Sequence, residues 1–112
     1  MKKISLNEGK PYAATGHFGT TSLRIIGKDE TGAQRFWVGL SYFLPAGGVA
    51  YCGEDQVNEK VYIVLDGEVT VKSKTQEYVL RAMDSLYISP GEGRSIINNT
   101  HKPASMLVIA NY

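Results

Sequence analysis

Four polar side chains with complementary chemistry lie between residues 54 and 94. They are the carboxylate of Glu54, the amide of Gln56, the ammonium of Lys60 and the guanidinium of Arg94. Arginine presents a planar fork that matches a carboxylate or a phosphate, and lysine supplies a compact charge beside it. Neither cation is a usable ligand for a divalent metal near neutral pH. These residue types therefore indicate recognition of a small anion and disfavour a metal centre.

The same region carries groups suited to acid–base chemistry. Glu54 is a candidate general base or acid, and Tyr62 is a further candidate proton donor. A partly desolvated lysine beside an arginine has a lowered pKa, which would suit Lys60 to proton abstraction or Schiff-base formation. We assign catalysis to Glu54, Lys60 and Tyr62, and substrate binding to Gln56, Arg94 and Cys52. These groups favour isomerase, lyase or decarboxylase chemistry on a small carboxylated or carbonyl substrate.

Short strands must position these side chains, because the local patterns are all-β with turn signals about every 8 to 12 residues. The candidate strands are rich in residues that suit a pleated surface. They are Ser22–Ile26, Gln34–Leu44, Val49–Gln56, Val61–Leu65, Glu68–Lys72, Glu77–Leu80, Ser85–Ile88, Arg94–Asn98 and Ser105–Ala110. Asp66-Gly67 separates two β-branched runs and predicts a type I′ hairpin turn between them. So many short strands in one domain favour a closed barrel or a sandwich, which limits exposed edges.

Strand alternation assigns the candidate side chains to three strand faces, because successive residues point to opposite sides. Those faces hold Cys52, Glu54 and Gln56; Lys60, Tyr62 and Val64; and Arg94, Ile96 and Asn98.

Two segments resemble the two sequence motifs of the cupin superfamily, which are small β-barrels of jelly-roll type. The first motif spans about 48–67, with Gly48 and Gly67 at its two glycine places. The second spans about 83–98, where Gly91 keeps the turn and Asn98 remains, while Met83 replaces the first glycine. The resemblance implies a single cupin domain over residues 1–112, with an all-β jelly-roll (double-stranded β-helix) barrel.

The family's four metal-ligand places are all substituted. Glu54, Gln56 and Lys60 stand where two histidines and a glutamate are usual, and Arg94 replaces the histidine of the second motif. In a cupin these places project into the barrel mouth, so the resemblance implies a polar, charged pocket there. A site that had only decayed would have filled with apolar residues. We therefore expect a repurposed pocket for a small organic anion, with no metal and no cofactor.

Other interpretations of the same residues stay open. Glu54 and Lys60 could form an internal ion pair without catalytic function, since buried charges must be paired. Arg94 could point to solvent at the barrel rim, Cys52 could be a small buried hydrophobe, and Tyr62 could serve only in core packing. The protein could also be a non-catalytic sensor or carrier, or a metal-dependent cupin with an irregular ligand set. His17 and His101 are expected at the surface, although the glycine-rich segment around His17 could fold over a barrel mouth.

Composition sets the remaining expectations. Twelve basic and eleven acidic residues give a net charge of +1, which offers no support for binding nucleic acid or an acidic membrane. The lone Cys52 and the N-terminus without an apolar segment favour a cytoplasmic protein. Residues 34–44 are nearly continuous in apolar surface, so one face of that strand is expected to pack on a partner subunit in a homodimer.

Overall fold

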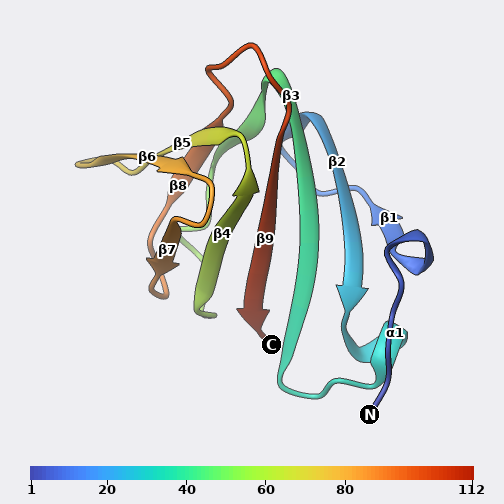
Figure 1. Ribbon diagram of the computed structural model, residues 1–112. Helices are drawn as coiled ribbons and strands as arrows, with labels where there is room; N and C mark the ends of the chain where they lie inside the picture. Colours follow the sequence, from blue (N-terminus) through green and yellow to red (C-terminus); the bar gives the residue numbers. More distant parts are fainter.

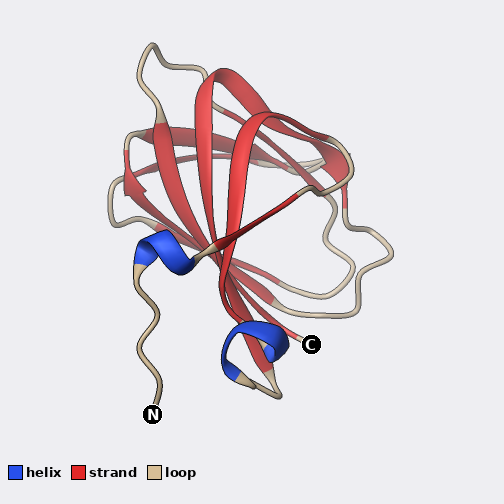
Figure 2. Ribbon diagram, turned by 90° about the vertical axis from the view of Figure 1, so that its right-hand side faces the viewer, coloured by secondary structure: helices blue, strands red, loops and turns tan.

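The computed structural model describes residues 1–112 and consists mainly of antiparallel strands (Figure 1). The strands are β1 (Lys10–Tyr12), β2 (His17–Ile26), β3 (Phe36–Cys52), β4 (Lys60–Asp66), β5 (Glu68–Lys72), β6 (Glu77–Arg81), β7 (Ser85–Ile88), β8 (Arg94–Ile97) and β9 (Ala104–Asn111). The short helical segments η1 (Leu6–Glu8) and α1 (Lys28–Thr31) lie outside the barrel (Figure 2). Neither has the length or apolar character that a membrane-crossing helix needs.

The long strand β3 organises the sheet. Its first half pairs with β9, its second half pairs with β8, and β2 pairs with both halves. The sheet continues from β8 to β5 and β6, and from β9 to β4 and β7. This arrangement makes a nearly closed antiparallel barrel, so the predicted all-β jelly-roll class is confirmed. The barrel brings β2, β3 and β4 together around one interior.

Two details of the predicted strands are wrong. Residues 34–44 and 49–56 were expected to form two strands, but β3 runs through both and stops at Cys52. It continues past Pro45 because Ala46 adopts a positive φ of 65°, and it ends because Gly53 turns the chain with a φ of 101°.

The expected hairpin at Asp66-Gly67 does not form. β4 pairs with β7 and β9, while β5 pairs with β6 and β8, so the two strands that flank this turn belong to different neighbours. Only Gly67 has a positive φ, of 78°, whereas a type I′ turn requires it at both central residues. The turn therefore redirects the chain at a corner of the barrel.

The predicted alternation holds where the strands are regular. Lys60, Tyr62 and Val64 are buried along β4, and Arg94 and Ile96 are buried along β8. The core consists of side chains from both sides of the barrel, namely Phe43, Val49, Tyr62, Val64, Val69, Val71, Leu80, Ile88, Ile96, Ala104, Met106 and Val108. Phe36 and Leu44, on the strand expected to meet a partner, are 47% and 60% exposed in the single chain, and the homodimer stays a prediction.

Candidate functional site

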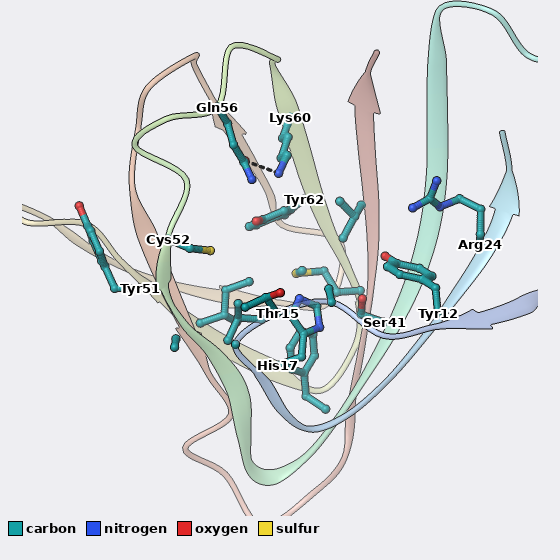
Figure 3. A pocket seen from close by; sticks show the side chains of 18 of the residues that line it. Tyr12, Thr15, His17, Arg24, Ser41, Tyr51, Cys52, Gln56, Lys60 and Tyr62 are labelled. Atoms are coloured by element: carbon teal, nitrogen blue, oxygen red, sulfur yellow. Dashed lines mark hydrogen bonds between the residues drawn. The ribbon is translucent and has the colours of Figure 1, made fainter. Parts of the chain in front are cut away.

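A cavity of about 620 Å³ opens into the barrel (Figure 3). Its volume lies within the ~300–1,000 Å³ usual for small-molecule sites. Core side chains including Phe43, Met106 and Val108 form part of its wall. Its polar lining comes from Tyr12, Thr15, His17, Arg24, Ser41, Tyr51, Cys52, Gln56, Lys60 and Tyr62. No aspartate or glutamate lines the cavity.

Four side chains form a hydrogen-bonded network at one wall, which we call the Lys60 cluster: Lys60, Gln56, Arg94 and Tyr62. Lys60 Nζ donates to Gln56 Oε1 at 2.5 Å, and Arg94 Nη1 donates to the same oxygen at 3.3 Å. Arg94 Nε donates to Tyr62 Oη at 2.9 Å. Both cations are thus held by neutral acceptors, and neither forms an ion pair. The cluster carries two positive charges without a counter-charge of its own.

The surroundings of Lys60 make its charged form unfavourable. Burial lowers the pKa of Lys60, and repulsion from Arg94 lowers it further, to about 8 from an ordinary 10.5. Burial raises the pKa of Tyr62, which therefore stays a neutral phenol, although the nearby Arg94 opposes this shift. The cluster thus combines a lysine that loses its proton readily with a phenol that keeps one.

Arg94 supports this wall from behind and does not line the cavity. It is only 7% exposed, so the alternative in which it points to solvent at the rim is wrong. Its guanidinium lies across Gly53, where a Cβ would collide with Nη1. The predicted contact between Arg94 and a substrate therefore has no support here, and its effect is exerted through Lys60, Gln56 and Tyr62.

Glu54 lies outside the cavity, contrary to the position predicted for it. Because β3 ends before it, its side chain turns to the surface, where Tyr51 Oη donates to Glu54 Oε1 at 3.0 Å and Lys74 forms an ion pair with it. We call these three residues the Glu54 cluster. The hydrogen bond and charge of Lys74, with the bond from Tyr51, lower the pKa of Glu54. An internal Glu54–Lys60 ion pair is therefore excluded, and Glu54 is not brought to the groups that could act on a ligand.

Cys52 and Tyr62 do line the cavity, together with residues that local spacing did not single out. His17 was expected at the surface, yet it lies at the start of β2 and faces the cavity (Figure 3). Burial lowers the pKa of His17, and the charge of Lys60 lowers it further, so its imidazole is neutral near pH 7. The glycine-rich context of His17 was the only sequence signal for this position.

Arg24 of β2, with Tyr12 of β1 and Trp37 of β3, lines another part of the wall (Figure 3 shows Arg24 and Tyr12). These residues were missed because they come from strands that pair only in the folded barrel. Cys52 is exposed to the cavity, so it does not act as a small buried core residue.

The four places that hold metal in related barrels do not fit a metal ion here. Of the residues at these four places, only Gln56 offers a neutral oxygen ligand that faces the cavity. Lys60 and Arg94 would repel a cation. His17 and Cys52 line the cavity, but no three histidine, cysteine, aspartate or glutamate side chains come together in a way that could hold a metal. We therefore derive no chemical step through a metal.

Comparisons with known proteins agree with this architecture. The cupin domain model matches residues 41–110. The β-D-galactosidase Rv1717 of Mycobacterium tuberculosis is 39% identical over 108 residues, which cover 96% of this chain and 91% of that protein.

Two solved structures share the fold at low sequence identity. The polyketide cyclase RemF of Streptomyces resistomycificus superposes with a TM-score of 0.85 at 20% identity, over 99% of this chain and 79% of that one. A predicted oxalate decarboxylase of Thermotoga maritima gives a TM-score of 0.83 at 17% identity, over 98% of both chains. The match to the cupin domain model, the 39% identical relative and the barrel topology agree, so the chain belongs to the cupin family.

Proposed function

We propose that the cavity binds a small organic anion, a carboxylated or carbonyl compound, and that the protein acts on it as a metal-independent enzyme of the isomerase, lyase or decarboxylase type. One observation carries the proposal: Lys60 and Arg94 have only neutral partners, at the wall of a cavity without a carboxylate. A buried cation without a counter-charge is unfavourable. An anionic ligand would supply the missing charge.

The Lys60 cluster could both bind such a ligand and react with it. With a pKa of about 8, Lys60 is protonated in most molecules at pH 7 and can bind the anion, while roughly a tenth carry a neutral amine. That amine can accept a proton from carbon or attack a carbonyl carbon. Gln56 orients Lys60 through its amide oxygen, and Arg94 helps to keep the pKa of Lys60 low.

Two further groups can hold or move protons in the same cavity. The neutral imidazole of His17 can accept or return a proton, and the phenol of Tyr62 can donate one. Proton transfer between two carbon positions can use one such group, or one group to accept the proton and another to donate it. The presence of these groups in one cavity supports an isomerisation or an elimination.

Hydrolysis of a β-galactoside is a second candidate, because the mycobacterial β-D-galactosidase is 39% identical over almost the whole chain. The aromatic rings of Tyr12 and Trp37 and the hydroxyls of Thr15 and Ser41 are compatible with a sugar. Most glycosidases, however, use two carboxyl groups beside the scissile bond. The cavity is lined by none. The geometry therefore favours the anion-binding function over the usual hydrolytic mechanism.

The proposal can be tested by measuring ligand binding and turnover in two variants, Lys60→Met and Lys74→Met. We expect Lys60→Met to weaken binding of small carboxylates, measured by calorimetry, and to lower turnover about 100-fold or more, the usual contribution of a general base. Lys74→Met removes a surface lysine and is the matched control, with binding and turnover near those of the unaltered protein. Melting temperatures of both variants would check that each is folded.

The ligand panel separates the alternatives. Binding of carboxylates without chemical change in any of them would indicate a carrier or sensor. Hydrolysis of nitrophenyl β-D-galactoside at the same rate in the Lys60→Met variant would overturn the assigned role of Lys60. Loss of carboxylate binding after treatment with EDTA, restored by a divalent metal, would contradict metal independence.

A further inference from the structure

The cavity contains a second cationic group, Arg24, far along the sequence from the Lys60 cluster and supplied by a different strand. Figure 3 shows Arg24 and Tyr12 on one side of the cavity and Cys52 and Gln56 on the other. Since Arg94 lies behind the wall, Lys60 and Arg24 are the two basic side chains that line the cavity. Their separation on β4 and β2 suits a ligand with two polar ends.

Aromatic rings hold the Arg24 guanidinium in place. Its central carbon, Cζ, lies 4.6 Å from the centroid of the Tyr12 ring and 4.2 Å from that of Trp37. Such contacts use the flat faces of the guanidinium and leave its N–H groups, which lie in its plane, for other partners. Gly39 makes room for both rings, because a Cβ there would lie 3.1 Å from Tyr12 Oη and 3.2 Å from Trp37 Cζ3.

The N–H groups of Arg24 have no acceptor in the protein. Its Nε is buried without a hydrogen-bond partner, and the guanidinium forms no ion pair. Buried polar groups are usually hydrogen-bonded, and an unpaired donor costs free energy. An aromatic cage that fixes an arginine without satisfying its donors is suited to a planar acceptor with two oxygens, which is a carboxylate.

We propose that Arg24 is the carboxylate-binding subsite of the cavity, and that the ligand is a sugar acid whose carboxylate lies on Arg24 and whose carbonyl or hydroxyl end lies at the Lys60 cluster. This inference rests on the proposed function and names its ligand class. The lining hydroxyls of Thr15 and Ser41 and the rings of Tyr12 and Trp37 suit the hydroxylated carbon chain between the two ends. The cavity of about 620 Å³ has room for a single sugar ring.

Paired ligands test the subsite. D-galacturonate and D-galactose differ only at carbon 6, where one has a carboxylate and the other an alcohol. We expect calorimetry to show tighter binding of galacturonate, and Arg24→Met to weaken that binding about 10- to 100-fold, as expected for hydrogen bonds to a charged group. The affinity for galactose should stay nearly the same. Arg81→Met, at an exposed arginine, is the matched control.

Two further variants keep the test decisive. Arg24→Lys retains the charge but not the fork, so it should restore only part of the galacturonate affinity. If Arg24→Met does not fold, Gly39→Ala disturbs the cage while keeping the guanidinium and should reduce the preference for galacturonate. Equal affinity of the unaltered protein for both ligands, or no binding of either, would overturn the inference. If Lys60→Met abolishes binding of galacturonate while Arg24→Met does not change it, the subsite is wrong and the proposed function stands.

Discussion

The Lys60 cluster and the Glu54 cluster contain similar side chains but shift the pKa of their lysine in opposite directions. Each combines a lysine, a tyrosine and a side chain with an oxygen acceptor, and the two acceptors, Glu54 and Gln56, lie just after the end of β3. In the Lys60 cluster the lysine pKa is lowered to about 8. In the Glu54 cluster the hydrogen bond and charge of Glu54 raise the pKa of Lys74.

Burial and the charge of the acceptor account for this difference. Lys60 is 9% exposed and its acceptor is the neutral amide of Gln56, whereas Lys74 is solvated and its acceptor is a carboxylate. The exposed ion pair between Lys74 and Glu54 is screened by water and salt, so it contributes little to the stability of the fold. If Glu54 had turned inward as expected, it would have neutralised Lys60. Its outward position keeps the cavity cationic, and this is what makes the cavity suitable for an anion.

Replacing Gln56 by glutamate should have the largest effect on carboxylate affinity, because it gives the Lys60 cluster a negative charge like the one in the Glu54 cluster. Gln56→Glu puts a carboxylate beside Lys60 and Arg94. An opposite charge at this distance raises the pKa of Lys60 towards its ordinary value. We expect affinity for carboxylates, measured by calorimetry, to fall about tenfold or more, because the new carboxylate neutralises the positive charge of the cluster and repels an anionic ligand.

The same substitution at an exposed position provides the control for Gln56→Glu. Gln76 accepts a hydrogen bond from Tyr78 at the surface, so Gln76→Glu adds the same charge away from the cavity. It should leave carboxylate affinity unchanged. A similar loss in both variants would mean that overall charge, and not the neutral acceptor at Lys60, governs binding.

Local sequence patterns predicted the all-β class and the buried faces of the regular strands, and the resemblance to cupins favoured a barrel over a sandwich. Alternation in the run from Lys60 to Val64 predicted that Lys60 and Tyr62 point to the same side, and they do. The prediction failed where β3 stops. Gly53 adopts a positive φ, the alternation ends there, and Glu54 turns outward while Gln56 still reaches Lys60 from a loop.

The rest of the cavity could not be predicted from local spacing. His17 and Arg24 reach it because β2 pairs along β3, and Tyr12 reaches it because β1 pairs with β2. Those pairings follow from how the barrel closes over many residues. Family spacing placed Arg94 in the mouth, but it could not show that the missing side chain of Gly53 lets Arg94 lie behind the wall.

The two lysines should give opposite dependences of stability on pH. The pKa of Lys60 is about 8 in the folded protein and 10.5 in the ordinary case, so between these values the unfolded chain binds more protons. The free energy of unfolding should therefore rise with pH from about 8 to about 10.5 through Lys60. Lys74, with a raised pKa, stabilises the fold below its ordinary pKa, and this stabilisation is lost as pH rises through the folded value.

Urea unfolding across this pH range would measure both effects as differences from the unaltered protein. Lys60→Met should remove the rise above pH 8, and Lys74→Met should leave it in place. An unchanged rise in Lys60→Met would show that the folded protein does not lower the pKa of Lys60.

Replacing Glu54 by glutamine should have the smallest effect, because Glu54 and its partner Lys74 are exposed and lie outside the cavity. Glu54→Gln removes the counter-charge of Lys74, so the pKa of Lys74 should return towards 10.5, which titration of the lysine by NMR would show. Carboxylate affinity should change less than about twofold, since screened surface charges contribute little. Turnover should also stay the same, and Lys74→Met should match it in both assays. A loss of turnover in Glu54→Gln alone would mean that Glu54 turns inward when ligand binds, and the contrast between the two clusters would then hold only for the free protein.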